Sequence, residues 1–158
     1  MRRRALMLAA SLAMLTVPVS AGQAGHASSV TIRILSVTRT FTAKDVAPKG
    51  LSAGDQARTT DGLYNAAPQF GKPKGALVGS DRGIITVRAD KRSGDFRGVA
   101  TLPGGTVTAA GRVPLDGTPS SAGVVSGTGR FASARGSVAI STLPGRGHAA
   151  NVFHLTLP

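Results

Sequence analysis

Short runs of β-forming residues, separated by clusters of turn-forming residues, are what most constrains the fold of this chain. The runs are rich in Val, Ile, Thr and Phe, and they end at Gly, Pro or Asp. Helical periodicity is missing from the sequence after residue 27. We expect eight or nine strands, over residues 30–42, 58–65, 76–80, 83–89, 95–102, 106–113, 123–127, 136–143 and 149–157. Strands at such regular spacing predict a single all-β domain, either a sandwich or a barrel.

The last run, residues 149–157, shows the period of a strand most clearly. Asn151, Phe153 and Leu155 share one face, and Val152 and His154 share the other. Neither face is fully polar. This fits a barrel whose interior and exterior both contact something other than water.

Turns and loops are expected where the β-forming pattern stops. Residues 43–54 and 66–75 contain prolines and glycines, and loops of this kind at a barrel mouth often bind ligands. The sequence Pro-Gly-Gly at residues 103–105 predicts a tight hairpin. We also expect a turn at Asp81 and Arg82, because neighbours on a strand point to opposite faces and do not pair.

The N-terminus is typical of a secretory signal peptide. Three arginines at residues 2–4 precede an apolar run at residues 5–17, and small residues then offer cleavage after Ala21, Ala24 or Ala27. We therefore expect a signal peptide over residues 1–27, a secreted protein, and a mature domain over residues 28–158. The apolar run is shorter than the roughly 20 residues that span a bilayer, so we expect no transmembrane segment. An uncleaved membrane anchor is the alternative.

Composition limits the partners that this chain can have. The formal charge is +12, and loss of the three signal arginines leaves +9, so the protein should approach anionic surfaces. The densest basic group is Arg88, Lys91 and Arg92, which we interpret as the solvated surface of a hairpin. No stacking aromatics lie among the basic residues, so we expect no nucleic-acid binding. Without cysteine, the domain depends on packing and sheet pairing instead of disulfides.

Residues 127–136 carry a more specific pattern than a generic turn. They read Gly-Thr-Gly-Arg-Phe-Ala-Ser-Ala-Arg-Gly, and glycines at such positions usually serve backbone conformations that a side chain forbids. The pattern resembles the signature of dirigent proteins and the related segment of allene oxide cyclases. Other short segments resemble the same families: Gly54-Asp55 before Leu63-Tyr64-Asn65, Val78-Gly79 before Gly83, and Ala110-Gly111-Arg112.

The resemblance runs from about residue 54 to the end of the chain. It implies a bacterial-type secreted member of the allene oxide cyclase-like or dirigent-like β-barrel superfamily. The fold implied is one small antiparallel barrel of about eight strands with a cavity for one small ligand. These families also imply a homotrimer.

Six residues are candidates for the site. Arg135 lies inside the signature, where an inward-pointing guanidinium could hold an anion or stabilise developing negative charge. Asp45 and Asp55 could transfer protons at the cavity, and all acidic residues of the chain are aspartates. We name Arg135, Asp45 and Asp55 as candidate catalytic residues. The structural alternatives are a paired Arg135 and an Asp55 that bonds its own turn.

Tyr64, Asn65 and Arg112 are the candidate ligand-binding residues. A phenol and an amide could orient a ligand in the lumen, although Tyr64 could equally close the core at the rim. We expect no metal, because the spacing of His148 and His154 matches no zinc motif and no cysteine or glutamate is present. No motif for another cofactor or for a hydrolase triad appears.

Two functions remain open at this point. The first is a secreted barrel that binds a small apolar or aromatic molecule and steers its stereoselective cyclisation or coupling, as an isomerase, a cyclase or a dirigent-like protein. The alternative is a non-enzymatic extracellular binding or surface-structural protein, held by its positive charge on anionic envelope components. Allene oxide cyclases use a barrel glutamate, and its absence here favours the alternative. A cavity with converging polar groups would favour the first function.

Overall fold

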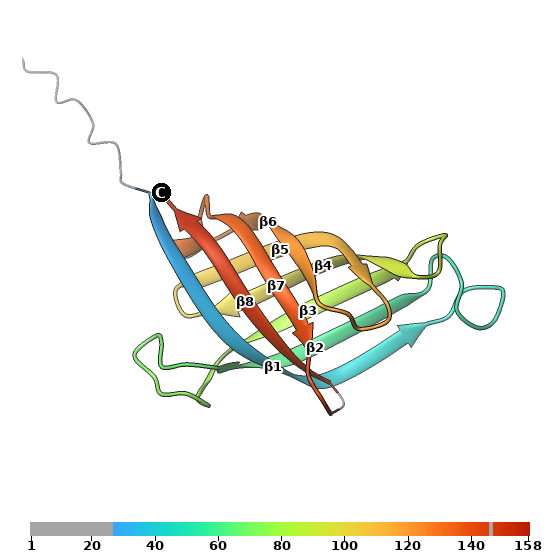
Figure 1. The fold of residues 1–158 in the computed structure, drawn as a ribbon, viewed down its shortest axis with the longest axis horizontal. Helices are drawn as coiled ribbons and strands as arrows, with labels where there is room; N and C mark the ends of the chain where they lie inside the picture. The colour runs from blue at the N-terminus through green and yellow to red at the C-terminus, as the bar shows by residue number, and fades with distance from the viewer. Residues whose placement is uncertain (1–26, 146) are drawn as a thin grey trace, which may run out of the picture.

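The chain folds into one closed antiparallel β-barrel (Figure 1). The computed structural model describes residues 27–145 and 147–158, so residues 1–26 of the expected signal peptide lie outside the described residues. The strands follow one another around the barrel in sequence order: β1 (Ser28–Lys44), β2 (Gln56–Asn65), β3 (Leu77–Val87), β4 (Ser93–Leu102), β5 (Gly105–Pro114), β6 (Ser120–Gly127), β7 (Arg135–Thr142) and β8 (His148–Leu157). The prediction of an all-β barrel is confirmed.

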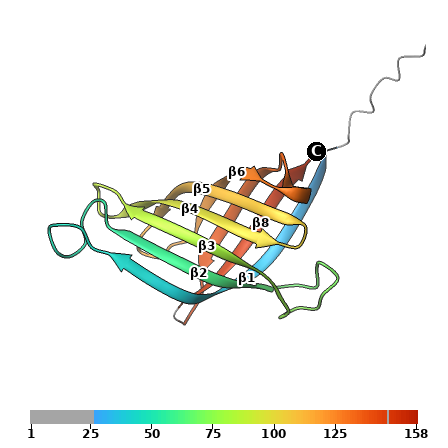
Figure 2. The same cartoon turned by 180° about the vertical axis from the view of Figure 1, so that it is seen from behind.

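Pairing between β1 and β8 closes the barrel. The two strands are antiparallel along residues 28–37 and 148–157. β1 also pairs with β2 over residues 34–44, and its register shifts between Thr38 and Thr40. An irregularity of this kind bends a strand. The second half of β1 therefore leaves β8 and continues with β2, and both strands run out past the closed ring in Figures 1 and 2.

Apolar side chains fill one end of the barrel. Phe131 comes from the short 3-10 turn η1 (Gly129–Phe131), which lies between β6 and β7. Its ring is fully buried in a core that includes Leu63, Val107 and Leu155. The predicted faces of β8 are confirmed, because Leu155 is buried whereas its neighbour His154 is exposed. We call this apolar end the Phe131 plug.

The glycines of residues 127–136 let the backbone that carries the plug pass close to other strands. A Cβ on Gly127 would lie 2.2 Å from the carbonyl oxygen of Phe131. A Cβ on Gly136, whose φ is +135°, would lie 1.9 Å from the carbonyl oxygen of His154. Only glycine fits such approaches. The signature segment therefore has a structural explanation, which is the closure of one barrel end.

One expected turn is wrong. Asp81 and Arg82 lie inside β3, which joins the two strands expected over residues 76–80 and 83–89. Each side chain has a place within the strand. Asp81 stands opposite Asp61 of β2, and Arg82 stands opposite Thr60 on the other face of the sheet. Both residues fit inside a strand, because Asp81 faces the lumen and Arg82 faces the outside of the barrel.

The plug predicts a large loss of stability when Phe131 is truncated. Phe131→Ala should lower the free energy of unfolding by about 3–5 kcal/mol, because it empties a fully buried site. Phe41→Ala is the matched control, since that ring is 63% exposed; its cost should stay within about 1 kcal/mol. Urea unfolding curves measure both. Equal costs for the two variants would contradict the role of Phe131 as a plug.

Candidate functional site

A cavity of about 120 Å³ remains in the barrel lumen beyond the Phe131 plug. Its wall is largely apolar and includes Phe96, Val107, Val138, Ile140 and Phe153. An apolar cavity of about 150 Å³ accepts benzene, so the lumen as it stands suits a fragment of nearly that size. A larger ligand has to extend beyond it. The cavity side chains that carry hydrogen-bonding groups include Ser36, Thr59, Asp61, Asp81 and Asn151.

Two aspartates face each other in this lumen. Asp61 of β2 and Asp81 of β3 are register partners, and both line the cavity. Directly opposed side chains on antiparallel strands have Cβ atoms about 4.5–5.5 Å apart. The two carboxyl groups therefore occupy one small, mainly apolar space, and they form the candidate site. We call them the aspartate pair.

The surroundings keep a proton on the pair at unusually high pH. Burial, the adjacent charge of Asp61 and a hydrogen bond with Asp61 together raise the pKa of Asp81 to about 7. A hydrogen bond from the Ser36 hydroxyl opposes part of this rise. Asp81 is therefore a carboxylic acid for a substantial part of the time at neutral pH. A group of this kind can donate a proton as well as accept one.

Asp61 supplies an acceptor that the protein leaves open. Its Oδ1 is buried and has no hydrogen-bond partner among the described residues. A buried carboxylate oxygen needs a donor. That donor is either the proton carried by Asp81 or a hydroxyl brought by a ligand. The site is thus suited to a molecule that offers a hydroxyl group to the pair.

Closure of the barrel adds two more polar groups to the pair. Asn151 of β8 donates from Nδ2 to Oγ of Ser36 on β1, with the two atoms 2.6 Å apart. This bond occupies the Ser36 oxygen as an acceptor, so the hydroxyl proton remains available for Asp81. The polar cluster therefore draws on β1, β2, β3 and β8.

The ring of Phe96 covers part of the cavity wall. A Cβ on Gly98 would lie 2.6 Å from Cζ of Phe96, and a Cβ on Gly83 would lie 3.5 Å from its Cε2. The ring thus lies over two residues that have no side chains. Because it is only partly buried and lines the cavity, it offers an aromatic surface on which a ligand ring can pack.

The three predicted catalytic residues lie away from the lumen cavity. Arg135 is exposed at the start of β7. Asp45 is exposed in the loop after β1, where it accepts a bond from the amide of Gly50. Asp55 accepts bonds from the amides of Val46 and Ser52, which lower its pKa. These contacts give Asp55 a structural part in its loop. The catalytic role of all three residues stays a prediction.

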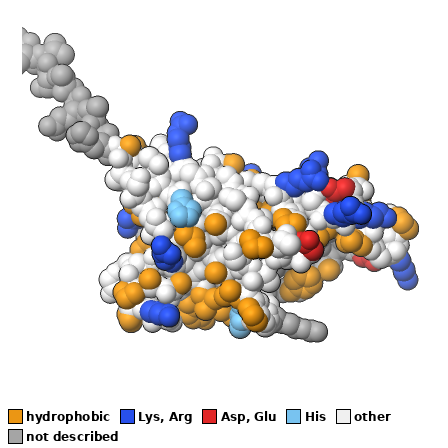
Figure 3. Space-filling model, viewed as in Figure 1, with side chains coloured by type: hydrophobic (Ala, Val, Ile, Leu, Met, Phe, Trp, Pro, Cys, Tyr) orange, Lys and Arg blue, Asp and Glu red, His pale blue; other side chains and the backbone are white. Residues whose placement is uncertain are grey.

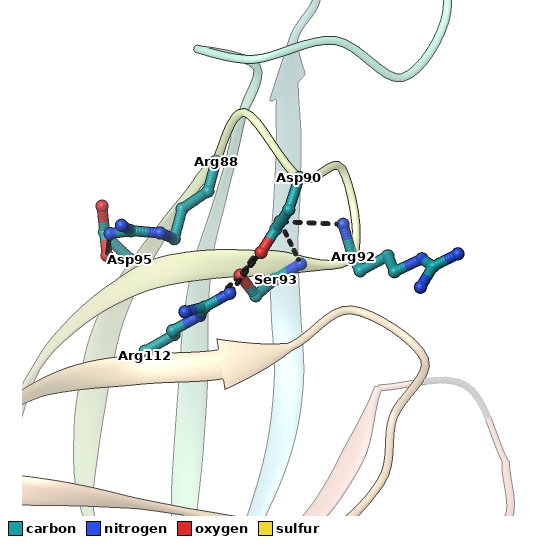
Figure 4. Close-up of polar contacts among 6 residues, drawn as sticks. All are labelled: Arg88, Asp90, Arg92, Ser93, Asp95 and Arg112. Atoms are coloured by element: carbon teal, nitrogen blue, oxygen red, sulfur yellow. Dashed lines mark hydrogen bonds and ion pairs between the residues drawn. The ribbon is translucent and has the colours of Figure 1, made fainter.

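The predicted ligand-binding residues also lie outside the cavity. Asn65 is buried, and its Nδ2 donates to carbonyl oxygens of the loop that follows, which it holds in place. Tyr64 is partly buried beside it. Arg112 pairs with Asp90 and donates from Nε to Oγ of Ser93 at 2.8 Å (Figure 4). Their role as ligand contacts stays a prediction.

The hairpin between β3 and β4 carries the densest basic group of the sequence. Arg88, Lys91 and Arg92 are all exposed there, as expected for a solvated surface. Bonds from the side chain of Ser93 and the amide of Arg92 hold the pKa of Asp90 well below its usual range. Figure 3 shows the basic side chains dispersed over the visible face and closest together near this end of the molecule, where aspartates also lie.

The sequence analysis names neither member of the aspartate pair as a site residue. Asp81 lies in an expected turn, and Asp61 has no motif around it that indicates a site. A signal for Asp61 did exist, because period two places it on the face of Leu63, which is fully buried. No local signal places Asp61 beside Asp81, since this depends on the register of β2 and β3.

Two kinds of feature are absent from the described residues. Residues 27–145 and 147–158 contain no group of three or more His, Cys, Asp or Glu side chains that could hold a metal ion. In the same residues there is no helix with the length and apolar character needed to cross a membrane.

The raised pKa of Asp81 predicts how stability depends on pH. The pKa is about 7 in the folded state and 3.8 for an unperturbed Asp, so the folded state binds more protons between these values. The free energy of unfolding should therefore fall as the pH rises from about 4 to 7, by roughly 2–4 kcal/mol. Asp81→Asn should remove this decline.

Urea unfolding of the wild type and Asp81→Asn at pH 5 and pH 8 measures this difference. Asp95→Asn is the control, because that carboxylate is exposed and pairs with Arg88. If the free energy of unfolding changed equally between pH 5 and pH 8 in the wild type and in Asp81→Asn, the result would contradict a raised pKa of Asp81.

Comparisons with known proteins agree with the barrel. No protein-family model and no curated protein matches the chain. Among solved structures, pyocyanin demethylase is similar with a TM-score of 0.67 and 22% identity, over 80% of this chain and 100% of that one. The Diels-Alderase AbmU from Streptomyces koyangensis has a TM-score of 0.67 and 16% identity, over 85% and 71% of the two chains.

A dirigent protein is among the similar structures as well. The pterocarpan synthase dirigent protein GePTS1 has a TM-score of 0.63 and 18% identity, over 94% of this chain and 98% of that one. The resemblance predicted from residues 127–136 is thus confirmed at the level of the fold. The chain is an eight-stranded antiparallel barrel, and its fold is similar to those of the Diels-Alderase AbmU and the dirigent protein GePTS1.

Proposed function

We propose that this protein binds a small apolar or aromatic molecule in its lumen and steers the cyclisation or coupling of that molecule. The observation that carries the proposal is the aspartate pair, a proton donor and acceptor inside a mostly apolar cavity. The names of two similar structures, the Diels-Alderase AbmU and the pterocarpan synthase dirigent protein GePTS1, support it. The Phe131 plug does not exclude ligand binding in the lumen, because the cavity and its polar groups lie beyond the plug.

Catalysis would combine shape with one proton relay. The apolar wall holds a flexible substrate in one folded geometry, which removes entropy from the barrier and selects one stereochemical outcome. Asp81 donates its proton to a carbonyl oxygen of the substrate as the ring bond forms. Asp61 accepts the proton of the attacking hydroxyl. One proton enters and one leaves, so the closure needs no oxidant or reductant.

The pKa of about 7 matches this role. A general acid works best when its pKa lies near the working pH, because it is then protonated often enough and still gives up its proton. A cycloaddition that transfers no proton would use the same pair differently. Asp81 would then hydrogen-bond to a carbonyl group and lower the barrier by polarising it.

Secretion and assembly belong to the same proposal. The basic and apolar N-terminus, residues 1–17, supports export. A homotrimer is proposed from the sequence resemblance to dirigent proteins and allene oxide cyclases. Native mass spectrometry of the protein purified from a secreting host reports the N-terminus, the number of subunits and any small molecule that remains bound.

The proposed function is tested with the open-chain precursor of the bound molecule that mass spectrometry identifies. The wild type should form the ring in enantiomeric excess, measured by chiral chromatography. Asp81→Asn should lower the rate by about 100-fold or more, because it removes the general acid. Asp95→Asn leaves the lumen intact and should retain the wild-type rate.

The alternative function predicts a different result. A protein that lacks a bound small molecule, retains an anionic polymer and leaves the product racemic would support the non-enzymatic binding protein. An Asp81→Asn variant with the full rate and the same enantiomeric excess would exclude the aspartate pair from the reaction.

A further inference from the structure

A second cavity lies on the outer face of the barrel. It measures about 460 Å³ and runs over the outward side of β1–β4, which lie side by side in Figure 2. Three arginines from three adjacent strands line it: Arg58 of β2, Arg82 of β3 and Arg97 of β4. Threonine hydroxyls of β1 and β2 complete its polar lining. We call this cavity the arginine groove.

Strand register brings the three arginines to one face. Arg58 and Arg97 both stand opposite Ile84, one on each side of it. Arg82 is two residues from Ile84 on the same strand, so it points the same way. Neighbouring strands lie about 4.8 Å apart, which places the Cα atoms of Arg58 and Arg97 about 10 Å from each other. Arginine side chains are long enough for the three guanidinium groups to converge on one ligand.

Among the described residues, no carboxylate forms an ion pair with an arginine of the groove. The described residues form two ion pairs, Arg88 with Asp95 and Arg112 with Asp90. Neither pair includes an arginine of the groove. Arg58 donates only to the neutral side chain of Gln56. The aspartate pair faces the lumen, on the other side of the sheet. Three like charges thus share one hollow, and an anion bound among them would relieve their repulsion.

The groove combines this charge with an apolar floor. Ile84 is partly buried between Arg58 and Arg97, and Val99 beside Arg82 is 37% exposed. The volume lies within the range of about 300–1,000 Å³ that is usual for small-molecule sites. A bare ion would leave most of it unfilled. A ligand with an anionic head and an apolar body matches both the arginines and the floor.

We propose that the arginine groove binds a small organic molecule that carries a phosphate or sulfate group. The planar forks of the guanidinium groups bind a tetrahedral oxyanion in bidentate geometry, and the threonine hydroxyls can donate to its remaining oxygens. The organic part rests on Ile84 and Val99. This site opens on the outward face of the sheet and shares the lining residues Thr59, Arg82, Gly83 and Val99 with the lumen cavity. Its proposed ligand does not depend on the function proposed for the aspartate pair.

The test is an NMR titration of the full barrel with phenyl phosphate and phenyl sulfate, against inorganic phosphate and neutral phenol. Amide shifts should move at Thr60, Ile84 and Val99 and not at the lumen residues Ser36 and Asn151. At least one ester should bind more tightly than inorganic phosphate, and phenol should leave the groove unshifted. The preferred ester identifies the oxyanion.

Variants that remove one positive charge distinguish a specific binding site from nonspecific electrostatic attraction. Arg82→Gln and Arg97→Gln should each weaken the preferred ester by about tenfold or more, because each removes a charge-assisted contact. Arg92→Gln removes the same charge from the hairpin, where the side chain points away from its neighbours (Figure 4). It should change the affinity by less than about twofold. Unchanged unfolding curves confirm that each variant is folded.

Three results would overturn the site. The first is a wild-type protein whose groove amides respond to neither ester. The second is an equal loss of affinity in Arg92→Gln and Arg97→Gln, which would mean unspecific attraction to a basic surface. The third is a protein that binds phosphatidylglycerol vesicles but neither ester, with a vesicle affinity that Arg97→Gln does not change. This result would mean that the positive charge serves membrane association.

Discussion

The antiparallel pairing of β1 with β8 is the constraint on which the rest of the structure depends. It turns an eight-stranded sheet into a closed ring, so each inward-facing side chain enters a narrow interior. Apolar residues gain stability there, whereas carboxyl groups lose their hydration. The raised pKa of Asp81 is a direct consequence of this enclosure. The same pairing brings Asn151 to Ser36, and so completes the polar cluster around the aspartate pair.

The two ends of the barrel differ in what they contribute. Around Phe131 the interior is packed, and Gly127 and Gly136 allow the backbone to approach as closely as this packing requires. Beyond the plug, side chains are smaller or absent at Gly83, Gly98 and Ala109, and a cavity remains. The packed core and the open cavity thus occupy different parts of one interior. The outward face of β2–β4 adds a third region, because alternation along each strand separates the lumen aspartates from the groove arginines.

Patterns of local sequence predicted most of the fold and little of the site. Turn residues between β-forming runs marked the strands, and period two identified the buried face of β8. The sequence predicts a turn at Asp81 and Arg82, because adjacent residues on a strand point to opposite faces and do not pair. A lumen that accepts a carboxyl group makes Asp81 a strand residue instead. Arg135 is a candidate catalytic residue because it lies in the signature, but its side chain is exposed. Pairs such as Asp61 and Asp81 follow from strand register, which local sequence does not contain.

The most direct test of this account is the ionisation of Asp81 itself. The carboxyl carbon shift of Asp81, assigned by comparison with Asp81→Asn and followed by NMR as the pH is raised, gives the pKa without any substrate. We expect a midpoint of about 7, together with a response at Asp61 when Asp81 loses its proton. A midpoint near 3.8, the ordinary value for Asp, would contradict an enclosed pair and the proton relay proposed from it.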